Sequence, residues 1–213
     1  MKKNVQNELD ILLTNYPQLS VCAEDIIVAF EMLKQTCLHG GLIMTCGNGG
    51  SAADAGHIVG ELMKSFKLKR PVTDEQRTAF LEAFPEEGEY FADNLQQGIP
   101  AISLVSQSSI FTASANDLTP DMAFAQQVFG YGRDGDLLIG ISTSGNALNV
   151  VNACKVARSC RIGTVGLTGE DGGKLLAICD VTIRVPASET FRVQEYHLPV
   201  YHALCAMLEA EFF

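Results

Sequence analysis

Short runs of apolar and β-branched residues recur along the chain, separated by stretches in which apolar residues return every three or four positions. The five runs are GLIMTC (41–46), AISLV (101–105), DLLIGIS (136–142), IGTVGLT (162–168) and DVTIRV (180–185). Each is typical of a strand buried on both faces. Helical spacing occupies the stretches between them: 51–66, 119–130, 146–159 and a short one at 172–178. Alternation of this kind predicts an α/β fold with a doubly wound parallel sheet.

Helices are also predicted at both ends of the chain. Residues 5–15 and 21–38 have apolar residues at helical spacing, with a break near Tyr16-Pro17, and residues 190–213 form a last apolar-rich helix. A length of 213 residues suits one domain. We therefore expect residues 1–213 to form a single domain in which residues 1–40 are N-terminal helices.

One segment, residues 67–98, interrupts the alternation between the first and second predicted strands. Thr73 and Gln76 have the spacing of a capping box before the apolar positions Phe80, Leu81 and Phe84. Such a pattern predicts a helix with one buried face, ended by Pro85, with a second helix at 86–95. We interpret the segment as a helical insertion that packs as a lid or subunit-interface element near the active site.

Composition narrows the class of partner. The net charge of −10 argues against nucleic acid and anionic membranes as partners. No apolar run approaches the length of a membrane span, and the N-terminus lacks the apolar core of a signal peptide. The seven cysteines are scattered and form no CxxC pair, which favours reduced core residues of a cytoplasmic protein.

Two polar loops follow predicted strands. They are Gly47-Asn48-Gly49-Gly50-Ser51 and Ser142-Thr143-Ser144-Gly145-Asn146. Either loop alone is equally well explained by ordinary turn and helix-cap chemistry. Two such loops after parallel strands favour a phosphate group held by backbone N–H groups, hydroxyls and helix N-termini. No Walker A loop and no strict GxGxxG occurs, so we expect no nucleotide cofactor.

A histidine and a carboxylate share one helix face beside the first loop. His57 and Glu61 are four residues apart, while Gln194 and His202 are eight apart with Pro199, a predicted kink, between them. An imidazole with a carboxylate suits general acid–base chemistry. Taken singly, each histidine is better explained by packing and the glutamate by solvation. The basic residues at 64, 67, 69 and 70 are interpreted as a solvated face rather than as substrate-steering groups.

Several longer stretches carry a family resemblance. They are CGNGGSAADAGHIVGEL (46–62), ASAND (113–117), GDLLIGISTSGNALNVVNA (135–153), VGLTGEDGGKL (165–175) and IRVPASETFRVQEYH (183–197). The chain resembles the sugar isomerase (SIS) domain family, and within it the bacterial phosphoheptose isomerases. The resemblance implies a five-stranded parallel sheet of flavodoxin-like strand order and a homotetramer with active sites between subunits. It also implies the interconversion of sedoheptulose 7-phosphate and D-glycero-D-manno-heptose 7-phosphate through an enediol.

The same resemblance implies roles for individual residues. Its catalytic pair falls on Glu61 and His202. Its substrate contacts fall on Asn48, Gly49, Gly50, Ser51, Asp117, Ser142, Thr143, Ser144, Asn146 and Gln194. A zinc ion, one per subunit in some members, would be bound by His57, Glu61, Gln194 and His202.

The chain also departs from the family pattern. Ala147 stands where members have Ser or Thr, and the insertion at 67–98 is longer than usual. Two alternatives therefore remain. One is an isomerase of another phosphosugar. The other is a non-catalytic SIS protein that binds a phosphosugar or associates with the replication initiator DnaA, although that branch lacks equivalents of Glu61 and His202.

Overall fold

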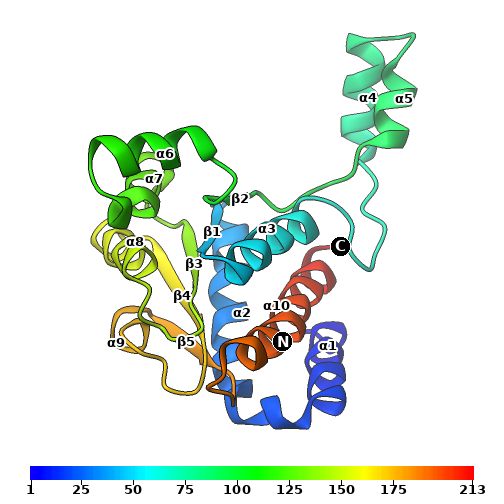
Figure 1. The fold of residues 1–213 in the computed structure, drawn as a ribbon. Helices are drawn as coiled ribbons and strands as arrows, with labels where there is room; N and C mark the ends of the chain where they lie inside the picture. Colours follow the sequence, from blue (N-terminus) through cyan, green and yellow to red (C-terminus); the bar gives the residue numbers. More distant parts are fainter.

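A five-stranded parallel sheet forms the centre of the protein in the computed structural model, which describes residues 1–213 (Figure 1). Its strands are β1 (Ile43–Gly47), β2 (Ala101–Ser103), β3 (Leu137–Ile141), β4 (Gly163–Thr168) and β5 (Val181–Arg184). The strand order is β2-β1-β3-β4-β5, and every neighbouring pair is parallel. The predicted doubly wound sheet of flavodoxin-like order is confirmed.

Helices cover both faces of the sheet because successive strand residues point to opposite sides. Ile43, Leu137 and Ile139 belong to one apolar cluster, and Met44 and Leu138 belong to the other. The first cluster is completed by α1 (Lys3–Asn15), α2 (Ala23–Leu38), α3 (Gly50–Met63) and α10 (Thr190–Phe212). The second is completed by α7 (Ala123–Tyr131), α8 (Leu148–Ser159) and α9 (Leu175–Ile178). Figure 1 shows these two groups on opposite sides of the sheet.

Several predicted boundaries differ from the structure. The break after residue 15 is a 3₁₀ helix, η1 (Pro17–Cys22), and a second, η2 (Pro120–Met122), precedes α7. Helix α6 (Ser108–Asp117) was not predicted. Strand β2 has only three residues, and two of them are half-buried. The expectation of burial on both faces is wrong there, because β2 lies at the edge of the sheet.

The insertion forms a helical hairpin that stands away from the rest of the molecule (Figure 1). Its helices are α4 (Asp74–Ala83) and α5 (Gly88–Asn94). The capping box of Thr73 and Gln76 is present at the start of α4, as predicted. No residue of α4 is buried, so the expected buried face is wrong for a single chain. The apolar positions instead meet α5, where the rings of Phe80 and Phe91 lie 6.2 Å apart.

Composition also led to expectations about the state of the cysteines and about membrane spans. All seven cysteines are free, and five of them are buried. None of the helices combines the length and the apolar character that crossing a membrane requires.

Candidate active site

The two polar loops line one cavity at the carboxyl ends of β1 and β3. This cavity, here called the loop cavity, has a volume of about 390 Å³. The predicted substrate residues that line it are Asn48, Gly49, Gly50, Ser51, Ser142, Thr143, Ser144 and Gln194. Ala147 lines it as well, so the methyl group that replaces a family hydroxyl faces the same space. Helix α3 begins at this cavity, and the free N–H groups of a helix N-terminus favour an anion.

Glycines and side-chain hydrogen bonds shape the loops. Gly49 and Gly145 have φ angles of 57° and 65°, which L-residues with side chains rarely adopt. A Cβ atom on Gly145 would also collide with the carbonyl of Gly172. Asn48 and Asn149 exchange two side-chain hydrogen bonds of 2.9 Å, which tie the first loop to α8. The cavity is therefore built by backbone constraints that only glycine satisfies and by one amide pair.

Gln194 reaches the cavity from α10 because Gly50 has no side chain. A Cβ atom on Gly50 would collide with the amide group of Gln194. Helix α10 is continuous through Pro199, so Gln194 and His202 lie on one unbroken helix.

Two predicted substrate residues do not line the loop cavity. The Asn146 side chain donates to the carbonyl of Ser144 at 2.8 Å and accepts the N–H of Lys174 at 3.1 Å. Its role within one chain is to brace the second loop. Asp117 lies at the end of α6 and accepts a hydrogen bond of 2.8 Å from Asn116.

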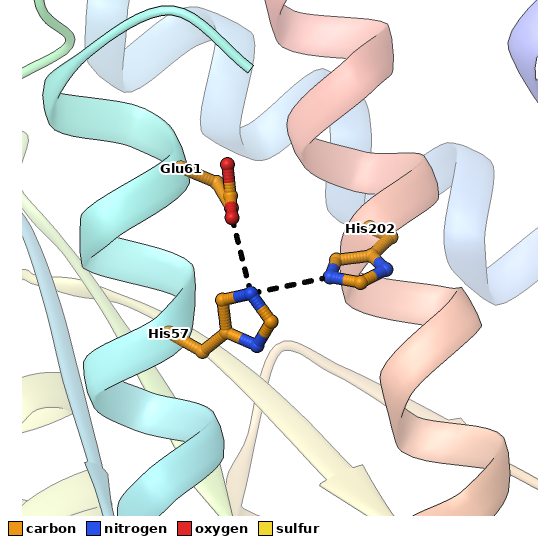
Figure 2. Close-up of side chains that lie close together, drawn as sticks. All are labelled: His57, Glu61 and His202. Carbon is orange, nitrogen blue, oxygen red and sulfur yellow. Dashed lines mark hydrogen bonds and ion pairs between the residues drawn. The ribbon is translucent and has the colours of Figure 1, made fainter. Parts of the chain in front are cut away.

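His57, Glu61 and His202 converge between α3 and α10 (Figure 2). The Nε2 atom of His57 lies 3.0 Å from Oε1 of Glu61 and 3.5 Å from Nε2 of His202. One ligand atom of each residue lies within 4.8 Å of the others. Two imidazoles and one carboxylate at this separation are a donor set that zinc accepts readily.

The surroundings of the cluster favour a neutral His202. Burial lowers the pKa of its imidazole, and the neighbouring His57 lowers it further, while the nearby Glu61 carboxylate opposes both effects. His202 is therefore unprotonated at neutral pH, the form in which an imidazole can accept a proton or bind a metal.

Two neighbours of the cluster were not singled out from the sequence. The Tyr201 hydroxyl lies 3.0 Å from Nδ1 of His57 and donates to the Asp54 carboxylate at 3.3 Å. Asp54 precedes His57 by three residues, so helical spacing could have placed it on the same face. No spacing rule could have paired Tyr201 with it across α3 and α10.

Arg70 corrects the interpretation of the basic segment after α3. Its side chain is not solvated, since the residue is only 1% exposed. The guanidinium donates to the carbonyls of Leu62 and Glu61 at 2.8 and 3.2 Å, and to the Glu209 carboxylate at 2.8 Å. The last carbonyls of α3 and a buried carboxylate together satisfy this cation, which anchors the helix end that carries Glu61.

Comparison with known proteins gives independent evidence about the family of this chain. The SIS domain family matches residues 18–83 and 77–169. The phosphoheptose isomerase of Aliarcobacter butzleri is 39% identical over 188 residues, which is 88% of this chain and 86% of that protein. That of Akkermansia muciniphila is 35% identical over 213 residues, covering 100% of this chain and 99% of that protein.

A solved structure agrees with these relatives. The phosphoheptose isomerase of Neisseria gonorrhoeae is similar to this chain with a TM-score of 0.70 and 33% identity. The match covers 96% of this chain and 91% of that one. The chain therefore belongs to the SIS domain family and, within it, to the phosphoheptose isomerases.

Proposed function

We propose that this protein is an aldose–ketose isomerase that interconverts sedoheptulose 7-phosphate and D-glycero-D-manno-heptose 7-phosphate. The observation that carries the proposal is the arrangement along α3. This helix begins at the loop cavity, and two to three turns later it presents His57 and Glu61 opposite His202 of α10. One end of the site thus suits a phosphate and the other suits proton transfer.

The loop cavity binds the phosphate in this scheme. Ser142, Thr143 and Ser144 offer hydroxyls, and the N-terminus of α3 offers N–H groups and a partial positive charge. Asn48 and Gln194 supply amides that can bind sugar hydroxyls. Asp117 and Asn146 stay in the proposed substrate set as residues that contact substrate in the assembled protein, because neither lines the cavity of a single chain.

The length of α3 favours a long sugar. His57 follows Gly50 by seven residues, which places it about 10 Å along the helix axis at 1.5 Å per residue. A substrate must span from the phosphate-binding helix start to the histidine–glutamate cluster. An extended heptose phosphate suits this separation better than a pentose phosphate.

Glu61 and His202 carry the proton transfers of the reaction. The Glu61 carboxylate removes a proton from C1 of the ketose and returns it to C2 of the enediol. The neutral His202 imidazole moves a proton between the oxygens on C1 and C2. The enediol is the only intermediate required, and the proton count of enzyme and substrate is unchanged after one turnover.

A zinc ion, one per subunit, fits the donor set of His57, Glu61 and His202. Gln194, whose amide group lies against Gly50 at the loop cavity, is the proposed fourth ligand, through its amide oxygen. When bound, zinc would polarise the oxygens of the substrate carbonyl and enediol.

The assembly and the place of action follow the family pattern in this proposal. We infer a homotetramer of single-domain subunits, spanning residues 1–213, that works in the cytoplasm with active sites between subunits. His57 is partly exposed in one chain, and the exposed apolar residues Ile11 of α1 and Leu198 of α10 line a pocket with His202. A second subunit covering this region would enclose the substrate.

The test is a screen of ketose and aldose phosphates with five, six and seven carbons. We expect turnover to be fastest with sedoheptulose 7-phosphate, followed by the appearance of the heptose 7-phosphate. Faster turnover of a shorter sugar would assign the protein to another phosphosugar. Binding without turnover of any of these sugars would favour the non-catalytic alternative.

A further inference from the structure

A hydrogen-bonded chain runs from Asp54 through Tyr201 to the back of His57. The Tyr201 hydroxyl lies 3.3 Å from Oδ1 of Asp54 and 3.0 Å from Nδ1 of His57. Asp54 and His57 come from α3, one turn apart, whereas Tyr201 comes from α10. These hydrogen bonds therefore link α3 and α10 where the two helices carry the cluster of His57, Glu61 and His202.

Burial limits the hydrogen-bond partners that Tyr201 and Asp54 can have. Tyr201 is 2% exposed, and Oδ2 of Asp54 is buried with no hydrogen-bond partner. The Tyr201 hydroxyl is thus the sole side-chain donor to Asp54. A buried carboxylate oxygen without a partner is costly, so the hydrogen bond from Tyr201 is the contact that stabilises this carboxylate.

Tyr201 also contacts both histidines through its ring. Its centroid lies 5.5 Å from that of His57 and 5.0 Å from that of His202, with interplanar angles of 71° and 81°. The ring therefore sets the position of the two imidazoles, while the hydroxyl selects the orientation of one of them.

The direction of the hydrogen bonds follows from the acceptors. The Tyr201 hydroxyl donates its single proton to the Asp54 carboxylate. The hydroxyl oxygen is then left to accept from the Nδ1–H of His57. This arrangement leaves a lone pair on Nε2, which faces Oε1 of Glu61 at 3.0 Å. A divalent cation beside these two atoms would be bound by both of them.

We propose that Asp54 and Tyr201 are positioning residues that hold the Nε2 lone pair of His57 toward Glu61 and His202 for a divalent cation. The inference rests on the proposed active site, but it concerns the binding of the ion rather than the reaction. Groups that orient a metal-binding histidine through its second nitrogen commonly change metal affinity about 10- to 100-fold when removed.

The test compares Tyr201→Phe with the unmodified full-length protein. The variant removes one oxygen atom and keeps the ring between the histidines. Zinc alone is titrated in competition with a chromophoric chelator. We expect zinc affinity to fall about 10- to 100-fold. We also expect kcat to fall while KM changes little, because the loop cavity is untouched.

Matched variants separate this role from general packing. Tyr131→Phe removes the hydroxyl of a partly exposed tyrosine on α7 and should leave zinc affinity unchanged. Asp54→Asn should weaken zinc binding in the same direction, and it provides the test if Tyr201→Phe does not fold. The double variant should lose no more zinc affinity than the weaker-binding single variant, because both substitutions break the same series of hydrogen bonds.

Each outcome decides a different point. Wild-type zinc affinity in both Tyr201→Phe and Asp54→Asn would overturn the inference. If the unmodified protein binds no zinc, the inference is also overturned. If that protein still turns over sedoheptulose 7-phosphate, the proposed function stands. If both substitutions weaken zinc binding but the unmodified protein turns over no phosphosugar, the inference stands and the proposed function is refuted.

Discussion

At the residue scale, the proposed chemistry depends on one carboxylate and one imidazole. Glu61→Gln keeps the size of the side chain and removes the base, and His202→Ala removes the second proton carrier. We expect either change to lower kcat by about 10²–10⁴-fold, the usual contribution of a positioned acid or base. Steady-state kinetics with sedoheptulose 7-phosphate measures it.

The control for that prediction is Glu24→Gln, which changes an exposed carboxylate in the first turn of α2, a helix that contributes no residue to the cluster. It should retain full turnover. If Glu61→Gln and His202→Ala also turn over at the rate of the unmodified protein, then neither residue is a proton carrier.

His197 gives a pH-dependent prediction at the same scale. The residue is fully buried, and burial lowers the pKa of its imidazole to about 4, with the Thr168 backbone opposing the shift only in part. In the unfolded chain the pKa returns to about 6.5. The unfolded state therefore binds more protons, so stability is complete above pH 6.5 and falls as the pH drops toward 4.

The expected loss from His197 is about 3 kcal/mol by pH 4, at about 1.4 kcal/mol for each pKa unit. Urea denaturation between pH 7.5 and pH 5 measures the slope. His197→Leu should flatten it, whereas His39→Gln, at the exposed end of α2, should not. An unchanged slope in His197→Leu would mean that other groups cause the acid sensitivity.

At the scale of elements, the α4–α5 hairpin projects from the body of the subunit (Figure 1). It packs on itself through the Phe80, Phe84 and Phe91 rings and leaves Tyr90 exposed. Ion pairs from Arg77 to Glu89 and Asp93 hold its two helices together. An ordered element that projects from the body is suited to contact another subunit.

Replacing residues 72–96 with a short Gly/Ser linker tests this role. The core should remain folded, because no residue of α4 is buried and Arg70 lies outside the deletion. We expect weaker assembly or a raised KM, measured by light scattering and steady-state kinetics. A variant with Phe84 and Tyr90 changed to serine should show the same effect more weakly. Unaltered assembly and kinetics would leave the hairpin without a role in either.

At the scale of the whole molecule, the site joins two functions that compete for the same side chains. His57, Glu61 and His202 can bind an ion, yet Glu61 and His202 are also the proposed proton carriers. Elemental analysis of the purified protein and activity before and after chelation separate the two. We expect bound zinc, loss of activity on chelation and recovery when zinc is returned.

A metal-free protein with full activity would contradict that prediction. Glu61 and His202 would then act without an ion, and the donor set would be a consequence of their closeness. Samples stripped of metal should be checked for folding, since an ion that bridges α3 and α10 also stabilises their packing.

The sequence by itself determined the alternation of strands and helices, the two polar loops and the His57–Glu61 pair. These features depend on local patterns: apolar runs, glycines that permit a tight turn, and residues four apart on one helix. The capping box at Thr73 is of the same kind, because both partners lie within one turn. Family resemblance added the strand order and the roles of His202 and Gln194, which local spacing alone could not select.

Only the tertiary structure decided which distant residues meet. Arg70 is buried because Glu209, far along the chain, faces it, and Tyr201 supports His57 because α10 crosses α3 at that point. The edge position of β2 and the projection of α4 have the same origin. Local patterns specify what a segment can form, whereas its burial and its charge partners depend on which other segments the packed chain brings beside it.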